Sequence, residues 1–166
     1  GISEVPKVDM SGISVMESDK LRRSLEDGKA IVVDFSDSRS YREGHIPAAR
    51  WTVRARINQL IGFLPSSAIY VATASDEAIA KLAATEMAKM TSTPIAYLEG
   101  GNKSWIEAGF PLSNGLEFPV GPANDVYVRP YDRDKGIEEA MHSYLDWEVA
   151  LVEQIDRDGT LKLPHF

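Results

Sequence analysis

The chain has 166 residues, of which 43% are hydrophobic and 26% are charged, and its formal net charge is −7. This size suits one globular domain with an extension and allows a substantial core. The negative charge argues against a surface that binds nucleic acid or an anionic membrane. The sequence contains no cysteine, which excludes disulfides, thiolate catalysis and cysteine-ligated metals.

The N-terminus carries no signal for export. Residues 1–8 lack the basic-then-apolar pattern of a signal peptide. The longest uncharged run, residues 57–75, is interrupted by Pro65 and by polar residues, so it does not resemble a transmembrane helix. We therefore predict a cytoplasmic location and no membrane partner. The first residue is Gly1 rather than methionine, which suggests a piece of a longer protein.

The first part of the chain alternates short apolar runs with polar stretches. The spacing of its apolar residues and its Gly and Pro positions indicate where elements begin and end. We predict a flexible lead-in over residues 1–12, a short helix through Leu21 and Leu25 that ends at Asp27-Gly28, a buried strand over residues 30–35, a polar loop over residues 36–44, a short strand at residues 49–51 and a helix over residues 53–61.

The stretch over residues 68–90 is where we expect the chemistry of the chain. Residues 68–71 form a short apolar run typical of a buried parallel strand, and the apolar spacing from Asp76 onward predicts a helix. A strand-to-helix turn points backbone N–H groups toward one spot, where α/β proteins bind anions or substrates. This turn holds two acids and no histidine, lysine or arginine. Its residues are Ala72, Thr73, Ala74, Ser75, Asp76 and Glu77.

The rest of the chain completes the domain organisation. A strand over residues 94–98 and a helix over residues 103–108 continue the alternation, which predicts an α/β domain with a parallel sheet covered by helices on both faces. Residues rich in proline and glycine then predict a linker, and an apolar stripe predicts a long helix over residues 137–155. We divide the chain into a domain over residues 1–112, a linker over residues 113–136 and a C-terminal helical extension over residues 137–166.

Three parts of residues 12–112 together resemble the rhodanese homology domain. Val33-Asp34, followed by residues 41–49 (YREGHIPAA), is similar to the family's strand-end Asp and its E-G-H-I-P-G-A signature. Residues 99–111 (EGGNKSWIEAGFP) are similar to its closing G-G-x-x-x-W-x-x-A-G-F-P signature. The strand, turn and helix of residues 68–90 stand in the place of its active-site loop. Residues 49–56 and the long tail are similar to bacterial proteins with several rhodanese domains in tandem.

The resemblance implies an α/β fold with a central parallel sheet of about five strands. It also implies sulfur transfer from thiosulfate or a similar donor through a cysteine persulfide. The family's cysteine opens a loop of the form C-x-x-G-x-R-S. When that loop is aligned by the helix that follows, its cysteine falls on Ala72, or on Thr73 after a shift of one residue. The glycine, arginine and serine fall on Ser75, Glu77 and Ala78. We therefore expect no sulfurtransferase activity.

The chemistry of the turn leads to the same expectation without the family. A persulfide needs a thiolate sulfur, and acids at the start of a helix repel thiosulfate, phosphate or arsenate. We interpret Ser75 as the helix N-cap, and Asp76 and Glu77 as residues that complement the helix dipole. The alternatives are a hydroxyl nucleophile at Thr73 or Ser75, and a degenerate loop that still binds a small oxyanion.

Other candidate residues have mainly structural interpretations. Trp51 and Trp105 are predicted to belong to the core, and His45 to be a packed, hydrogen-bonded histidine. His45 with Glu43 and Asp34 is too sparse a set for a metal site, so we predict no metal and no cofactor.

Arginines are dense over residues 39–56, and we predict ion pairs with Asp34, Asp37 and Glu43. The alternative is a docking patch for an acidic partner or a small anion. The candidate binding residues are Asp34, Arg39, Arg42 and Arg54.

These observations lead to three hypotheses of function. The first is a catalytically silent rhodanese-like module that acts structurally or by binding within a larger sulfurtransferase-type protein. The second is a degenerate rhodanese that binds a small oxyanion, or that uses Thr73 or Ser75 in another transfer reaction. The third is an interaction domain that works through the C-terminal helix. The expected partners are other rhodanese domains of a longer parent protein or a second subunit.

Overall fold

The structure is a computed structural model that describes residues 9–126 and, beyond them, Glu138, His142, Leu145 and Asp146. The chain divides into two compact units, Gly1–Val126 and Tyr127–Phe166. The four described residues of the second unit are helical. The rest of the helix predicted over residues 137–155 lies outside the described residues. The fold reported below is that of the first unit.

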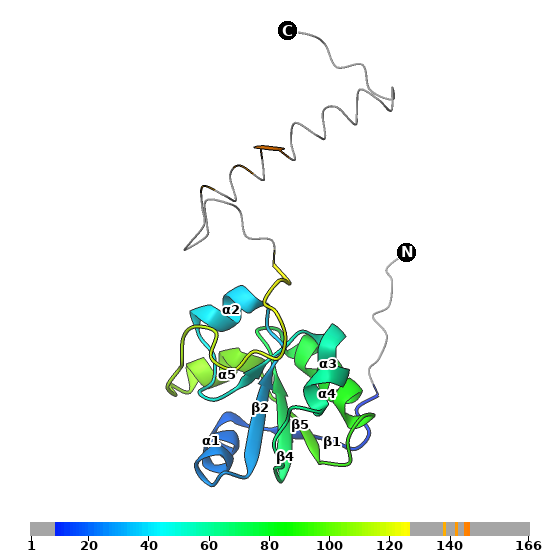
Figure 1. The fold of residues 1–166 in the computed structure, drawn as a ribbon. Helices are drawn as coiled ribbons and strands as arrows, with labels where there is room; N and C mark the ends of the chain where they lie inside the picture. The colour runs from blue at the N-terminus through cyan, green and yellow to red at the C-terminus, as the bar shows by residue number, and fades with distance from the viewer. Residues whose placement is uncertain (1–8, 127–137, 139–141, 143–144, 147–166) are drawn as a thin grey trace, which may run out of the picture. The chain divides into compact units, whose positions relative to one another are not determined.

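A five-stranded sheet forms the centre of this unit, with the strand order β1-β5-β4-β2-β3 and every neighbouring pair parallel (Figure 1). The α/β class and the parallel sheet of about five strands are thereby confirmed. Because all five strands run in one direction, the loops that follow them gather at the same edge of the sheet. The strands are β1 (Ile13–Met16), β2 (Ala30–Asp34), β3 (Arg50–Trp51), β4 (Ile69–Thr73) and β5 (Ile95–Leu98).

Helices cover both faces of the sheet, as the sequence predicts. The helices α1 (Ser18–Glu26), α2 (Ser38–Glu43) and α5 (Gly101–Glu107) cover one face, and α3 (Ile57–Ile61) and α4 (Glu77–Ala88) cover the other (Figure 1). A short 3₁₀ turn, Arg54–Arg56, precedes α3. No helix of the described residues is long and apolar enough to cross a membrane.

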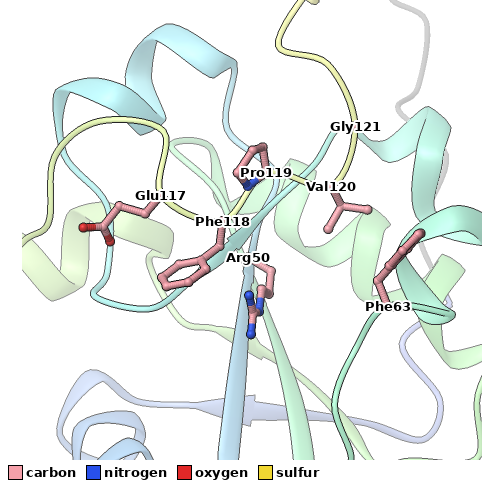
Figure 2. A pocket seen from close by; sticks show the side chains of 7 residues that line it. All are labelled: Arg50, Phe63, Glu117, Phe118, Pro119, Val120 and Gly121. Carbon is pink, nitrogen blue, oxygen red and sulfur yellow. The ribbon is translucent and has the colours of Figure 1, made fainter.

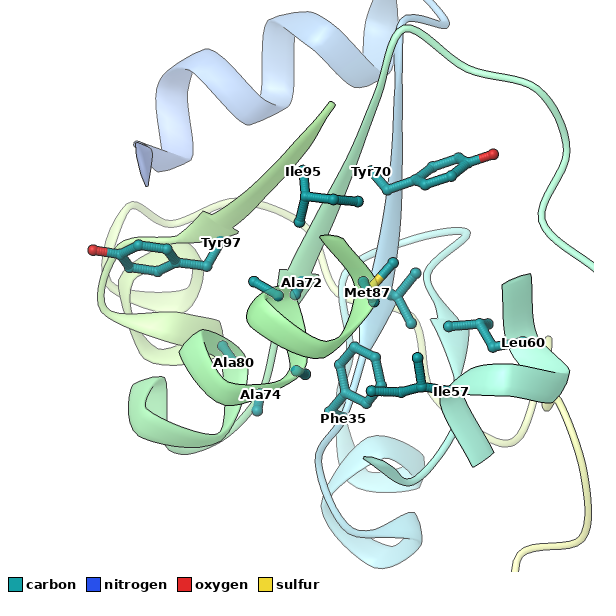
Figure 3. Packing of buried hydrophobic residues seen from close by; sticks show 13 residues of the cluster. Phe35, Ile57, Leu60, Tyr70, Ala72, Ala74, Ala80, Met87, Ile95 and Tyr97 are labelled. Carbon is teal, nitrogen blue, oxygen red and sulfur yellow. The ribbon is translucent and has the colours of Figure 1, made fainter. Parts of the chain in front are cut away.

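Alternation along the strands divides the core into two clusters. Val32 packs under α1, α2 and α5, whereas its neighbour Val33 packs under α3 and α4, as expected for side chains that alternate across a strand. Figure 3 shows the second cluster, in which Phe35 and Met87 lie between the sheet and α3. Both predicted core tryptophans, Trp51 and Trp105, are buried in the first cluster.

Two elements differ from the sequence prediction. The region predicted as lead-in and helix start contains β1, an edge strand whose Val15 is 47% exposed, so its apolar pattern is weak. The region predicted as a polar loop contains α2, which Asp37 caps by accepting a hydrogen bond from the Ser40 amide at 2.9 Å. A six-residue helix with a polar sequence shows too little apolar periodicity to be recognised.

The chain from residue 113 to residue 126, which we call the strap, is hydrogen-bonded to the domain. Ser113 exchanges two backbone hydrogen bonds with His45, and residues 118–120 run beside Trp51 of β3, whose amide donates to the Phe118 carbonyl at 2.9 Å. Thr52 Oγ1 donates to the Val120 carbonyl at 3.1 Å. The first part of the predicted linker thus covers the β3 edge of the sheet, and residues 127–136 lie outside the described residues.

A substitution at Gly101 tests how closely the start of α5 approaches the loop after β4. A Cβ atom added at Gly101 would lie 2.4 Å from the Ala74 carbonyl oxygen, and its φ of +61° disfavours any L side chain. Gly101→Ala should therefore lower the free energy of unfolding by about 2–4 kcal/mol in urea titrations. Gly109→Ala is the control, because Gly109 shares the positive φ but has open space around it, and it should cost only about 1 kcal/mol. Equal losses would contradict the packing described.

Candidate functional site

The loop after β4 lies at the carboxyl edge of the sheet, between the loop after β2 and the start of α5. The Ser75 amide donates to Ser36 Oγ at 2.8 Å, and the Asn102 amide donates to the Ala74 carbonyl at 2.9 Å. The predicted turn over Ala72–Glu77 is shorter than expected. Ala72 and Thr73 belong to β4, Glu77 begins α4, and residues 74–76 alone form the loop.

The acids at the start of α4 accept hydrogen bonds from backbone amides of the domain. Asp76, and not Ser75 as predicted, is the N-cap of α4, because its carboxylate accepts from the Ala78 amide at 2.9 Å. Glu77 accepts from the Gly100 amide at 3.1 Å and pairs with Lys81 at 3.1 Å. The hydrogen bond from the Gly100 amide holds the pKa of Glu77 below its ordinary value. Glu77 therefore stays ionised at neutral pH beside the positive end of α4.

Beneath the loop, four buried polar residues form a hydrogen-bonded cluster that we call the loop-base network: Asp34, Ser36, Thr73 and Asn102. Asp34 accepts from the Ser36 amide and from Asn102 Nδ2, each at 2.8 Å. Asn102 Oδ1 accepts from Thr73 Oγ1 at 2.7 Å. The network ties the end of β2, the end of β4 and the start of α5 to one another.

Ser36 and Asn102 are members of the site that the sequence prediction missed. Ser36 Oγ receives hydrogen bonds from the Ser75 amide and from Asn102 Nδ2, so it links the network to the loop above it. A signal for both was present in the sequence. Each is a polar residue just beyond the carboxyl end of a predicted strand, and such residues converge at one edge of a parallel sheet.

The predicted binding residues do not gather at the loop. Asp34 is buried in the network, Arg39 forms an exposed ion pair with Glu43 at 3.1 Å, and Arg42 is exposed on α2. Arg54 pairs with Glu86 of α4. The predicted pairing of arginine with Glu43 is confirmed. The predicted pairing with Asp34 is wrong within the described residues, because the Ser36 backbone amide and the Asn102 side-chain amide donate to that carboxylate instead.

His45 is a structural residue, as predicted. It is buried and stacks on Tyr41 with 3.7 Å between ring centroids. One ring nitrogen, Nδ1, lies 2.7 Å from the Tyr41 carbonyl oxygen, and the other, Nε2, lies 3.3 Å from Glu117 Oε2. With both nitrogens engaged away from the loop, His45 has no free position from which to activate Thr73 or Ser75 as a base.

The buried carboxylate of Asp34 makes stability depend on pH. Burial raises the pKa of Asp34 above its ordinary value, against the opposing effect of its hydrogen bonds to Ser36 and Asn102. The folded state therefore binds more protons at this group than the unfolded state does. Its contribution to stability is full below the unfolded pKa of about 3.9 and is lost as pH rises through the higher folded pKa.

Asp34→Asn should remove this pH dependence. The free energy of unfolding of the variant minus that of the wild type should rise from about pH 4 toward neutrality, with a slope of at most about 1.4 kcal/mol per pH unit. Urea titrations of both proteins at a series of pH values measure the difference. Asp37→Asn is the control, because the hydrogen bonds from Ser40 lower the pKa of Asp37, and its difference should run the opposite way. A constant or falling difference for Asp34→Asn would contradict the assignment.

Comparison with known proteins agrees with this geometry. Residues 17–108 match the family described as "Rhodanese-like domain". A crystal structure of a thiosulfate sulfurtransferase from Pseudomonas aeruginosa is 36% identical, with a TM-score of 0.81, over 89% of this chain and 28% of that one. This chain thus spans little more than a quarter of that protein. No match is found among curated protein sequences.

Shorter structures share the fold. The RPA3614 protein from Rhodopseudomonas palustris CGA009 is 25% identical, with a TM-score of 0.53, over 62% of this chain and 86% of that one. A rhodanese-related protein from Thermoplasma volcanium is 19% identical, with a TM-score of 0.54, over 63% of this chain and 99% of that one, which shows the fold alone. The chain belongs to the rhodanese-like domain family.

Proposed function

We propose that this chain is a catalytically silent rhodanese-like module that serves a structural or binding role within a larger sulfurtransferase-type protein. The observation that carries the proposal is the state of the loop after β4. It contains no sulfur atom, and its Ser75 amide and the Ala78 amide in the first turn of α4 donate hydrogen bonds to side chains of the domain itself. The fold that supports sulfur transfer is retained without the group that would carry sulfur.

The chemistry of sulfur transfer explains why the loss is complete. A thiolate attacks the outer sulfur of thiosulfate, the S–S bond of the donor breaks, and sulfite leaves with its electron pair while a persulfide forms on the enzyme. Neither the methyl group of Ala72 nor the hydroxyl of Thr73 can hold that sulfur. Both positions are also fully buried, within β4.

Electrostatics at the loop also disfavour binding of the donor. The positive end of a helix favours an anion by only about 0.3–1 kcal/mol. Here the carboxylates of Asp76 and Glu77 already occupy that end of α4. A thiosulfate dianion would meet two like charges at the place where it needs amide donors. This arrangement favours the silent module over a degenerate loop that still binds an oxyanion.

The larger parent protein is supported by the comparison with thiosulfate sulfurtransferase. That structure matches 89% of this chain but extends far beyond it. A catalytically silent domain within such a protein still packs against domains that retain the nucleophile, because a fold persists without its activity.

A thiosulfate:cyanide assay tests the silence directly. The purified chain should produce thiocyanate at the rate of the protein-free blank, because no thiolate is available to form the persulfide. Isothermal titration with sodium thiosulfate should give no saturable heat. Turnover above the blank would overturn the proposal, and saturable binding without turnover would favour the oxyanion-binding alternative.

Two cysteine substitutions test whether activity is absent because the thiol is missing or because the loop has no anion-binding site. Thr73→Cys places a thiol in a fully buried position, where burial raises the thiol pKa, whereas Ser75→Cys places it on the exposed loop. Ser75→Cys should react with a disulfide reagent at least about ten times faster than Thr73→Cys.

We expect neither variant to transfer sulfur from thiosulfate, because Asp76 and Glu77 remain in place. Strong activity of either one would show that a cysteine alone restores the site, and that the two carboxylates do not close it. Circular dichroism confirms that both variants are folded before their activities are compared.

A further inference from the structure

A pocket with a volume of about 390 Å³ lies between β3, the strap and Phe63, the second residue after α3 (Figure 2). It is separate from the loop after β4. Its floor is the strap backbone beside Trp51, and its opposing sides are formed by Phe118 with Arg50 and by Phe63 with Val120. We call it the β3 pocket; it is lined by Arg50, Phe63, Glu117, Phe118, Pro119, Val120 and Gly121.

The walls of the β3 pocket expose aromatic surface. Phe63 is 74% exposed and Phe118 is 39% exposed, although a folded domain stabilises itself by removing such side chains from water. Both rings line the same concave surface, with Pro119 and Val120 between them. Clustered exposed apolar side chains of this kind are typical of a surface that another protein covers.

The lining of the β3 pocket contains one cationic side chain, Arg50, and one acidic side chain, Glu117. The Arg50 guanidinium lies 4.6 Å from the centroid of the Phe118 ring, and within the described residues it forms no ion pair. The nearby Glu117 carboxylate instead lies 3.3 Å from His45 Nε2. Arg50 is half-buried, and a guanidinium beside an aromatic ring can still bind a carboxylate through two parallel hydrogen bonds from its outer N–H groups.

The length of the similar thiosulfate sulfurtransferase suggests where the partner comes from. That structure matches 89% of this chain, but the match takes up only 28% of its own length. The family match ends at residue 108, before the strap begins, so the strap, which supplies most of the β3 pocket, lies beyond the common domain. In a longer protein of this kind, neighbouring domains are the nearest source of a segment that could fill the pocket.

We propose that the β3 pocket docks a segment of a neighbouring domain in the longer protein, with an acidic side chain bound by Arg50 and an adjacent apolar side chain held between Phe63 and Phe118. This inference deepens the proposed function, since it rests on the chain being a binding module and names the surface that binds. It does not involve the loop after β4, so the two proposals can fail separately.

A capped dipeptide, N-acetyl-Phe-Glu N-methylamide, serves as the probe. Titrated into the ¹⁵N-labelled chain, it should shift the Arg50 side-chain Nε–H signal and the pocket's amide signals in one saturable step. These amides are those of Phe63, Glu117, Phe118, Val120 and Gly121. The matched dipeptide with Gln in place of Glu should bind at least about three times more weakly, because it lacks the carboxylate. Arg50→Gln should abolish this difference between the two dipeptides, and Phe63→Ser should weaken the binding of both.

Arg22→Gln is the matched control. Arg22 also lies over a phenylalanine ring, 5.1 Å from the Phe110 centroid, but it is outside the β3 pocket, so this variant should bind like the wild type. The proposal would be overturned by an absence of saturable shifts or by equal binding of both dipeptides. Equal binding of 3-phenylpropionate would indicate a small-molecule site and would also overturn it. Shifts of the same signals with protein concentration alone would identify a second copy as the occupant and also overturn it. Failure of the proposed function would appear separately, as thiocyanate production.

Discussion

The structure depends on one buried carboxylate, that of Asp34 at the end of β2. A charge removed from water is costly unless it is hydrogen-bonded, and Asp34 receives hydrogen bonds from the Ser36 amide and from Asn102. Those two donors come from the loop after β2 and from α5, and Asn102 also accepts from Thr73 at the end of β4. One side chain therefore fixes the relative positions of three segments at the carboxyl edge of the sheet. Replacing it by an apolar residue would leave the Ser36 amide without this acceptor and would remove one of the two acceptors of Asn102 Nδ2.

The hydrogen bonds that fix this edge also occupy several of the amides that an anion would need. A cradle for thiosulfate needs backbone amides that point into free space, but the Ser75 amide donates to Ser36 and the Ala78 amide to Asp76. Glu77 likewise accepts from the Gly100 amide at the start of α5. The loop and the start of α4 are thus held by hydrogen bonds to side chains of the same chain. The two acids are therefore part of the hydrogen bonding that stabilises this edge of the sheet.

The sequence predicts the parts of the fold that have strong patterns. Buried strands such as Ile69–Thr73 and the amphipathic helix Glu77–Ala88 are recognisable from apolar runs and spacing. The edge strand Ile13–Met16 and the polar helix Ser38–Glu43 are not, because their residues are largely exposed and gain their structure from neighbouring elements. The loop-base network is harder still, since Asp34 and Asn102 are far apart in the chain and meet only when the sheet forms. The backbone conformation of Ala48 is also not predictable from the sequence pattern. Ala48 stands at a glycine position of the family signature, and its φ is 62°. This conformation costs about 1–2 kcal/mol for a residue with a side chain.

The hydrogen bonding of the two sites differs. Among the described residues, no buried side-chain nitrogen or oxygen lacks a hydrogen-bond partner, and this includes the side chains of the loop-base network. At the β3 pocket, Arg50 lies over the Phe118 ring and forms no ion pair within the described residues, and Phe63 is largely exposed to water. Binding releases free energy where groups gain partners that they lacked before, and this is why we place the proposed docking surface beside the strap and not at the loop after β4.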